Sequence, residues 1–376
     1  MDENQQQRLF VAQPSFQATI NLQKRKTSDT DELDATLDTL LLVAGTGHEE
    51  LGEEISRLVG KKLANVSLSR FADSEVGVQY KDQVRGRNVF IIQPCATPVN
   101  DNILELLLTA SAARRADANR VTAVIPYFGY KHHRRAMSTS TKHQSRFLSS
   151  NAMDFAKMLT EMGVDHVISI DLQRPGQGHE ACFFDHSVPS EVIVTTELMI
   201  DYFMKNIKFN NNIVIVSPNA ECVKKARKFQ LAFRRAYNHD VKLATYLQSE
   251  TGSGPTDVST LQDKLGKVRI EGTDVVIVDD LIDTAETVTA LSKRLRDEGA
   301  RNVYVCASHG IFSEESMRRI EDSDVAKVFV TNSLPLNAGY RSPKVIQISV
   351  ASLLARIILS HHFRTQLHDD DSLQMD

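Results

Sequence analysis

The sequence predicts an α/β protein built from two similar halves, each a mostly parallel sheet flanked by helices. Most strand candidates are continuous apolar runs, the pattern typical of strands that are buried on both faces of a parallel sheet. Segments with apolar residues at helical spacing alternate with these runs. A length of 376 residues with 41% hydrophobic residues suits two domains of ordinary size, each with its own core.

Residues 1–38 are polar and aperiodic, and we expect a disordered arm there. The first domain is expected at residues 39–190. Its predicted strands are residues 40–46, 66–71, 88–93, 120–128 and 166–172, and its predicted helices are residues 48–60, 100–116 and 151–163.

The second domain is expected at residues 191–366, followed by an acidic tail at 367–376. Its predicted helices are residues 192–207, 220–233, 286–299 and 350–363, and its predicted strands are residues 212–218, 242–247, 274–280, 302–308 and 327–333. Two stretches rich in Ser, Thr and Gly, residues 136–150 and 248–260, are expected to be mobile, exposed loops.

Composition excludes several classes of protein. A net charge of −4 gives no general attraction to nucleic acid or to an anionic membrane. No apolar run approaches the roughly 18 residues that span a bilayer. The first residues, "MDENQQQRLF", resemble neither a secretory signal nor a transit peptide, so we expect a cytoplasmic protein. The cysteines form no C-x-x-C pair and predict neither a thiolate zinc site nor a disulfide framework; they are Cys95, Cys182, Cys222 and Cys306.

The segment "VDDLIDTAET", residues 278–287, carries the strongest functional signal. Its paired carboxylates, Asp279 and Asp280, are expected at the carboxyl end of a strand, where ligands of parallel sheets bind. Such a pair can accept hydrogen bonds from the cis hydroxyls of a ribose, and the start of the next helix can bind an anion. The alternative is that these acids only solvate the strand end and cap the helix. We interpret the segment as a sugar-phosphate site with seven residues: Asp279, Asp280, Asp283, Thr284, Ala285, Glu286 and Thr287.

This segment resembles the ribose-phosphate loop of the ribose-phosphate pyrophosphokinases, the phosphoribosyl pyrophosphate (PRPP) synthetases. The resemblance extends from about residue 40 to 363, through "VRGRNVFIIQ", "VNDNILELL", "RVTAVIPYFGY", "MGVDHVISIDL", "SPNA", "SHGIFS" and "VTNSLP". It implies two phosphoribosyltransferase-like domains, ATP and ribose 5-phosphate as substrates, Mg²⁺ as cofactor, a hexamer built from dimers and a role in nucleotide biosynthesis. The family reaction transfers the pyrophosphoryl group of ATP to the 1-hydroxyl of the sugar.

The resemblance also implies an ATP site. "RFADSE" is similar to the adenine-binding stretch of the family, with Phe71 as stacking platform and Asp73 and Glu75 as polar contacts; the alternative is an ordinary strand. Where the family has an Arg-Gln pair that faces ATP, this chain has His132 and His133. We expect these histidines to be solvated and not to form a metal site with the nearby His143.

Several charges of the family's catalytic centre are missing. Gln173 stands two residues after Asp171 where the family has a histidine, and Asn219 replaces an aspartate, so the implied metal site of Asp171, Gln173 and Asn219 is weakened. In the catalytic loop, Gln248 and Glu250 stand at the positions of a lysine and an arginine. No intact catalytic residue is therefore expected there.

Glu286 replaces a glycine of the family's phosphate loop. With Asp283 it has the spacing of a capping box, so the carboxylates are expected to occupy the amides that a phosphate would use. Two like charges, such as this carboxylate and a phosphate, repel by roughly 4 kcal/mol when they lie about 4 Å apart at an effective dielectric constant near 20. Glu286 is therefore expected to oppose phosphate binding.

Three hypotheses follow. The first is a weakly active or non-catalytic member of the family, a pseudoenzyme, that regulates catalytic PRPP synthetase subunits in a hetero-oligomer. A homo-oligomer is the other assembly that we expect. The second is an active diphosphokinase that uses compensating residues such as Arg134, Arg135 or Lys142. The third is a phosphoribosyltransferase that acts on a base, which fits the loop but not the doubled domain plan.

Overall fold

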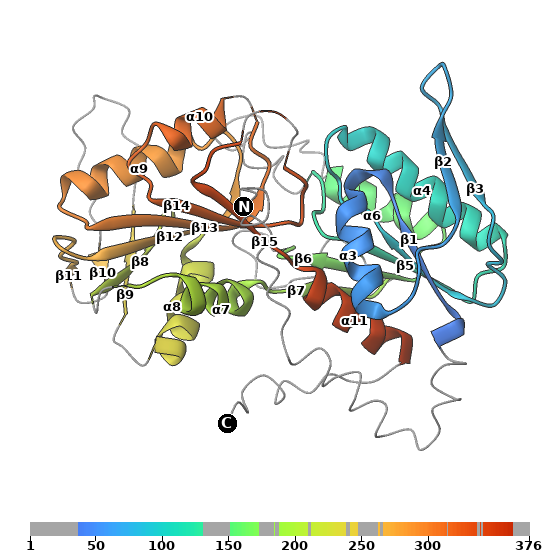
Figure 1. Ribbon diagram of the computed structural model, residues 1–376, viewed down its shortest axis with the longest axis horizontal. Helices are drawn as coiled ribbons and strands as arrows, with labels where there is room; N and C mark the ends of the chain where they lie inside the picture. The colour runs from blue at the N-terminus through green and yellow to red at the C-terminus, as the bar shows by residue number, and fades with distance from the viewer. Residues whose placement is uncertain are drawn as a thin grey trace, which may run out of the picture. The chain divides into compact units, whose positions relative to one another are not determined.

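The chain forms two compact α/β units in a computed structural model (Figure 1). The structure describes residues 37–130, 151–172, 184, 188–209, 212–237, 241–246, 262–263, 266–313, 315–336, 339 and 341–363. Residues 1–36 of the predicted arm, both predicted mobile loops and the acidic tail lie outside these residues. Unit 1 is made of the residues up to Ser169, of Ala181–Glu191 and of Ser349 onwards, and unit 2 of Ile170–Glu180 and Val192–Ile348.

Unit 1 contains a five-stranded sheet in the order β1-β4-β5-β6-β7, and the neighbours from β1 to β6 pair in parallel. Its strands are β1 (Leu40–Ala44), β4 (Asn88–Ile92), β5 (Arg120–Ile125), β6 (His166–Ile170) and β7 (Ser190–Ile193). The short helix η2 (Thr46–His48) and the helices α3 (Glu49–Val59), α4 (Val99–Arg115) and α6 (Asn151–Glu161) follow in the connections. A separate antiparallel hairpin consists of β2 (Val66–Arg70) and β3 (Val76–Tyr80).

The last helix, α11 (Ala351–Phe363), belongs to unit 1, whereas the sequence predicted residues 191–366 as one domain. The helix packs against α3, and the hydroxyl of Ser349 donates a 2.7 Å hydrogen bond to Glu54. Its apolar side is buried, with Leu354, Ile358 and Leu359 at most 2% exposed. Membership of a domain depends on such long-range packing, which a local pattern does not record.

Unit 2 contains an eight-stranded sheet in the order β11-β10-β9-β8-β12-β13-β14-β15. Its strands are β8 (Ile213–Ser217), β9 (Lys242–Thr245), β10 (Gln262–Asp263), β11 (Gly266–Lys267), β12 (Asp274–Ile282), β13 (Asn302–Gly310), β14 (Lys327–Thr331) and β15 (Val345–Ile348). The pairs from β9 to β15 are parallel, and β10 and β11 add an antiparallel edge. Its helices are α7 (Thr196–Asn206), α8 (Val223–Tyr237), α9 (Glu286–Asp297) and α10 (Ser316–Glu321).

Strand β12 shows why an unbroken apolar run predicts a parallel strand. Val275 and Ile277 pack into the core on one face of the sheet, and Val276 and Val278 into the core on the other. All four side chains are fully buried, so the predicted sheet covered on both faces is confirmed.

The structure differs from the prediction at several elements, and β3, β10, β11 and α10 were not predicted. The expected helix at residues 192–207 is preceded by strand β7, which extends to Ile193, and helix α7 begins only at Thr196. Branched residues such as Val192 and Ile193 favour a strand over a helix. Strand β15 was not predicted. None of the described helices is long and apolar enough to cross a membrane.

Candidate functional site

The sequence predicted Asp279 and Asp280 at the end of a strand. In the structure both lie within strand β12. The strand continues to Ile282 because it pairs with β13 as far as Gly310. On its other side it pairs with β8 only as far as Ile277. The two carboxylates therefore lie just beyond the last paired residue of β8, at the carboxyl end of the parallel sheet, where such folds bind ligands.

The carboxylate of Asp279 is buried and held by groups of the chain itself. The thiol of Cys222 donates a 3.1 Å hydrogen bond to Asp279 Oδ1, and the backbone amide of Asp280 donates one of 2.8 Å to the same atom. Burial, followed by the negative charge of Asp280, raises the pKa of Asp279 to about 6.

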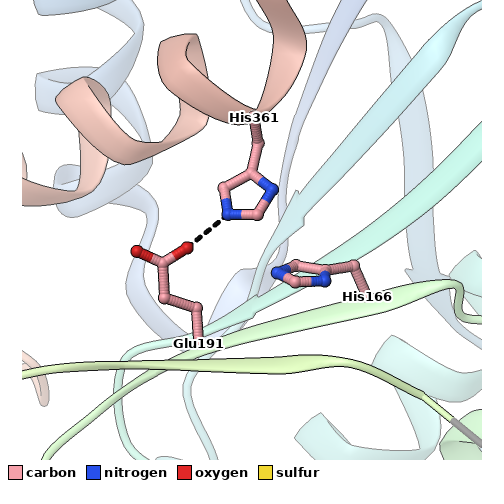
Figure 2. Close-up of side chains that lie close together, drawn as sticks. All are labelled: His166, Glu191 and His361. Carbon is pink, nitrogen blue, oxygen red and sulfur yellow. Dashed lines mark hydrogen bonds and ion pairs between the residues drawn. The ribbon is translucent and has the colours of Figure 1, made fainter. Parts of the chain in front are cut away.

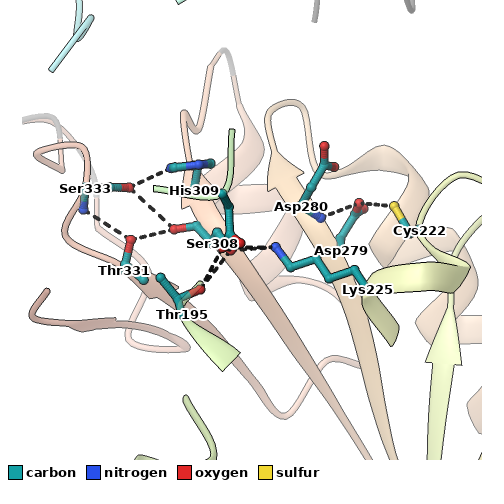
Figure 3. A network of polar contacts seen from close by, with 10 residues as sticks. Thr195, Cys222, Lys225, Asp279, Asp280, Ser308, His309, Thr331 and Ser333 are labelled. Atoms are coloured by element: carbon teal, nitrogen blue, oxygen red, sulfur yellow. Dashed lines mark hydrogen bonds and ion pairs between the residues drawn. The ribbon is translucent and has the colours of Figure 1, made fainter. Parts of the chain in front are cut away.

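Lys225 of α8 lies next to a second buried carboxylate, Asp171. Its Nζ is 3.5 Å from Asp171 Oδ2 and donates a 2.5 Å hydrogen bond to the hydroxyl of Ser308 (Figure 3). The hydroxyls of Ser308 and Thr195 both donate to Asp171 Oδ2, the latter over 2.8 Å. Burial acts to lower the pKa of Lys225, but the carboxylates of Asp171 and Asp280 outweigh it, so the pKa is raised and the side chain stays an ammonium.

Ser308 is itself fixed by a layer of polar groups behind it. The hydroxyl of Thr331 donates to its carbonyl oxygen over 2.6 Å, and Ser333 lies 2.8 Å from the ring of His309 (Figure 3). All four residues are at most 1% exposed. The contact from Thr331 holds the backbone of Ser308, whose hydroxyl bridges Lys225 and Asp171. We call Asp171, Asp279 and Asp280 the acidic centre.

The predicted capping box at Asp283 is wrong. Helix α9 begins at Glu286, and its N-cap is Ala285, which has a left-handed φ of 62° and makes no side-chain capping bond. Asp283 instead accepts a hydrogen bond from the hydroxyl of Ser313. Because the N-cap is Ala285, Asp283 lies two residues before the capping position.

Glu286 is 67% exposed, and one carboxylate oxygen lies 3.6 Å from the guanidinium of Arg319. Arg319 also donates to the carbonyl oxygen of Thr284. Thr287 is exposed in the first turn of α9. The glutamate therefore does not occupy the amides at the start of the helix, contrary to the sequence interpretation.

The three residues predicted to bind adenine lie together at the tip of the β2–β3 hairpin in unit 1. The amide of Phe71 donates to the carbonyl of Glu75 over 2.9 Å, and the amide of Glu75 donates to Asp73 Oδ1 over 3.1 Å. The segment is thus a turn and not the strand considered as its alternative. The ring of Phe71 is 60% exposed and is available for stacking.

Five predicted site residues lie outside the described part of the chain, so the structure places none of them. They are His132, His133, Gln173, Gln248 and Glu250.

Comparison with known proteins agrees with this architecture. Residues 40–163 match the family described as the N-terminal domain of ribose phosphate pyrophosphokinase, and residues 262–372 the phosphoribosyl synthetase-associated domain. The ribose-phosphate pyrophosphokinase of Nostoc sp. is 36% identical over 95% of this chain and 97% of its own length. The chain belongs to the ribose-phosphate pyrophosphokinase family.

Other members are similarly close. The chloroplastic ribose-phosphate pyrophosphokinase 2 of Arabidopsis thaliana is 37% identical over 89% of this chain and 76% of its own length. The crystal structure of phosphoribosylpyrophosphate synthetase from Mycobacterium smegmatis superposes with a TM-score of 0.74, at 26% identity, over 86% of this chain and 99% of that one. The family and fold predicted from the sequence are therefore confirmed.

Two of the residues that the sequence predicted as Mg²⁺ ligands, Asp171 and Asn219, are described by the structure, and their surroundings do not suit that ion. Asp171 is engaged by an ammonium and two hydroxyls. The side-chain oxygen of Asn219 accepts a 2.9 Å hydrogen bond from the amide of Cys222, the residue before α8. Magnesium prefers several free oxygen ligands in an octahedral arrangement, which these two residues do not offer.

Sequence reasoning missed the residues that contact the predicted acids, among them Cys222, Lys225, Ser308 and Arg319. Ser308 lies in "SHGIFS", a stretch that was matched to the family without a role for any residue. Lys225 follows Asn219 by six residues on a basic helix, where a lysine normally points to solvent. Only the structure shows that it is turned inward.

Proposed function

We propose that this protein is a weakly active or non-catalytic member of the PRPP synthetase family that regulates catalytic subunits of the same family in nucleotide biosynthesis. The observation that carries the proposal is the position of Lys225. The ammonium of Lys225 next to Asp171 is a positive charge of the protein itself, at a place where a bound cation would otherwise provide one. A lysine cannot bridge phosphate oxygens with the geometry of a divalent metal ion.

The neighbouring residues support the same proposal. Cys222 covers an oxygen of Asp279 that a ribose hydroxyl would otherwise use. At the sequence level, Gln248 and Glu250 stand in place of the two cations of the catalytic loop. Loss of one well-placed electrostatic group typically costs about 10²–10³ in rate, so several such losses leave little turnover.

An active ribose-phosphate diphosphokinase is the second candidate, and one observation favours it. Asp279 and Asp280 are both present, adjacent and at the ligand-binding end of the sheet, so they can still accept sugar hydroxyls if Cys222 turns away. In this case Mg²⁺, ATP and ribose 5-phosphate would be used as the family name implies, and the purified chain would form PRPP without a partner.

Co-expression with a catalytic homologue tests the regulatory role. The tagged full-length chain is purified together with an untagged ribose-phosphate pyrophosphokinase from the same cells, and PRPP formation is measured with and without the tagged chain. We expect a mixed oligomer whose rate per catalytic subunit, or whose response to nucleotides, differs from that of the homologue alone. Two separate homo-oligomers with unchanged rates would refute the regulatory role.

A further inference from the structure

A second polar cluster lies in unit 1, and it belongs to no part of the site described above. His166 of β6, Glu191 of β7 and His361 of α11 each offer one ligand atom, and these atoms lie within 4.8 Å of one another. His361 Nε2 and Glu191 Oε2 are in hydrogen-bond contact (Figure 2). The rings of His166 and His361 lie 4.2 Å apart between centroids, at an angle of 43°. We call these residues the His–Glu cluster.

His166 is the residue that calls for an explanation. It is 6% exposed, and neither ring nitrogen has a hydrogen-bond partner within the part of the chain that the structure describes. Buried polar groups in folded proteins are almost always paired. Figure 2 shows one edge of the ring turned towards Glu191 and His361.

We propose that His166, Glu191 and His361 bind one Zn²⁺ ion. Two imidazoles and a carboxylate are a recognised zinc ligand set, in which water completes the tetrahedron. In a tetrahedral zinc site the ligand atoms lie about 3.3 Å apart, and the three ligand atoms of the cluster already lie within 4.8 Å of one another. On binding, the ion takes the place of the hydrogen bond between His361 and Glu191, and it gives one of the two unpartnered ring nitrogens of His166 a partner.

The place of the cluster gives the site a role. His361 is 170 residues away from Glu191 in the sequence, and the ion would join the last helix of unit 1 to the edge of its sheet. An ion that binds only the folded chain stabilises it by mass action. The site would therefore hold α11 in place, independently of the acidic centre in unit 2.

Zinc binding is measured by equilibrium dialysis of the metal-stripped full-length chain. The Cys222→Ser variant serves as background, because Cys222, Asp279 and Asp280 form the other cluster of metal-ligand side chains in the described residues. We expect one equivalent of Zn²⁺ per chain. Glu191→Gln and His361→Gln should weaken binding by more than the roughly 10–100-fold that follows loss of an outer-shell partner. Glu53→Gln, an exposed substitution in the same unit, should leave it unchanged. Equal zinc affinity in the Cys222→Ser background and in all three variants would overturn the proposal.

Cobalt substitution locates the ion without relying on loss of binding. Co²⁺ in the Cys222→Ser background should show ligand-field bands without a thiolate charge-transfer band. Adding His361→Cys should create that band, because the new thiolate then ligates the ion. Absence of the band in a chain that keeps its circular dichroism spectrum and still binds one Co²⁺ would place the ion elsewhere and refute the site.

Discussion

The ammonium of Lys225 lies 3.5 Å from the carboxylate of Asp171, and both side chains are largely buried, at 15% and 5% exposure. This pair stands where the family resemblance implied a metal-directed acid. The acidic centre is therefore partly neutralised by the chain itself.

Replacing Lys225 by Met should destabilise the protein by about 3–5 kcal/mol, because the buried Asp171 then has no counter-charge. Urea unfolding at pH 7 measures the change. Lys224→Met, next to it but exposed, is the matched control and should change stability by less than about 0.5 kcal/mol. The double variant Lys225→Met/Asp171→Asn should recover much of the loss. A Lys225→Met variant as stable as its control would show that the Lys225–Asp171 pair does not stabilise the fold.

Replacing Glu286 by Gln should tighten ribose 5-phosphate binding several-fold at most. The carboxylate is two-thirds exposed and paired with Arg319, and exposed charges of this kind contribute about 1 kcal/mol or less. Glu286→Gly should behave like Glu286→Gln, since the left-handed residue is Ala285 and not Glu286. Titration calorimetry of both variants gives the comparison. A gain of a hundredfold or more would show that the glutamate does block the phosphate site.

Asp279 should make stability depend on pH between about 4 and 6. The pKa of its carboxyl is raised from 3.8 to about 6 in the folded chain, so the folded state holds this proton more tightly than the unfolded state does. Its contribution to stability is thus fully present below pH 4 and is lost as the pH rises through 6, by up to about 1.4 kcal/mol per unit.

The Asp279→Asn variant removes this titration. Its free energy of unfolding should therefore fall less between pH 4 and pH 6 than that of the wild-type chain, as measured by urea unfolding at half-unit intervals. Glu197→Gln, an exposed substitution, is the control and should follow the wild-type curve. Parallel curves for the wild type and Asp279→Asn would contradict the raised pKa.

Asn219 should stabilise the turn that leads into α8. Its side-chain oxygen accepts from the amide of Cys222, so Asn219→Ala should cost about 1 kcal/mol and Asn219→Asp almost nothing, since either side chain can accept this hydrogen bond. Thermal unfolding monitored by circular dichroism distinguishes the two variants. An alanine variant as stable as the aspartate variant would show that this hydrogen bond does not stabilise the turn.

The sequence predicted the buried strands well because their signal is local. A run such as residues 275–278 is apolar on both faces, and β12 is buried on both. The site could be predicted only in part. The resemblance located Asp279 and Asp280, but the inward turn of Lys225 and the pairing of Glu286 with Arg319 depend on tertiary contacts between distant segments. The left-handed Ala285 overturned the capping box for a related reason, since alanine gives no sequence signal for that conformation.

The most direct test of the account is the rate at which the purified full-length chain alone forms PRPP and AMP. The assay uses saturating Mg²⁺, ATP and ribose 5-phosphate, beside the Nostoc ribose-phosphate pyrophosphokinase under the same conditions. We predict a rate at least about 10²–10³ lower than that of the relative, because the chain's own side chains engage the acidic centre. A rate within tenfold of the relative's would contradict the account and establish the chain as an active diphosphokinase.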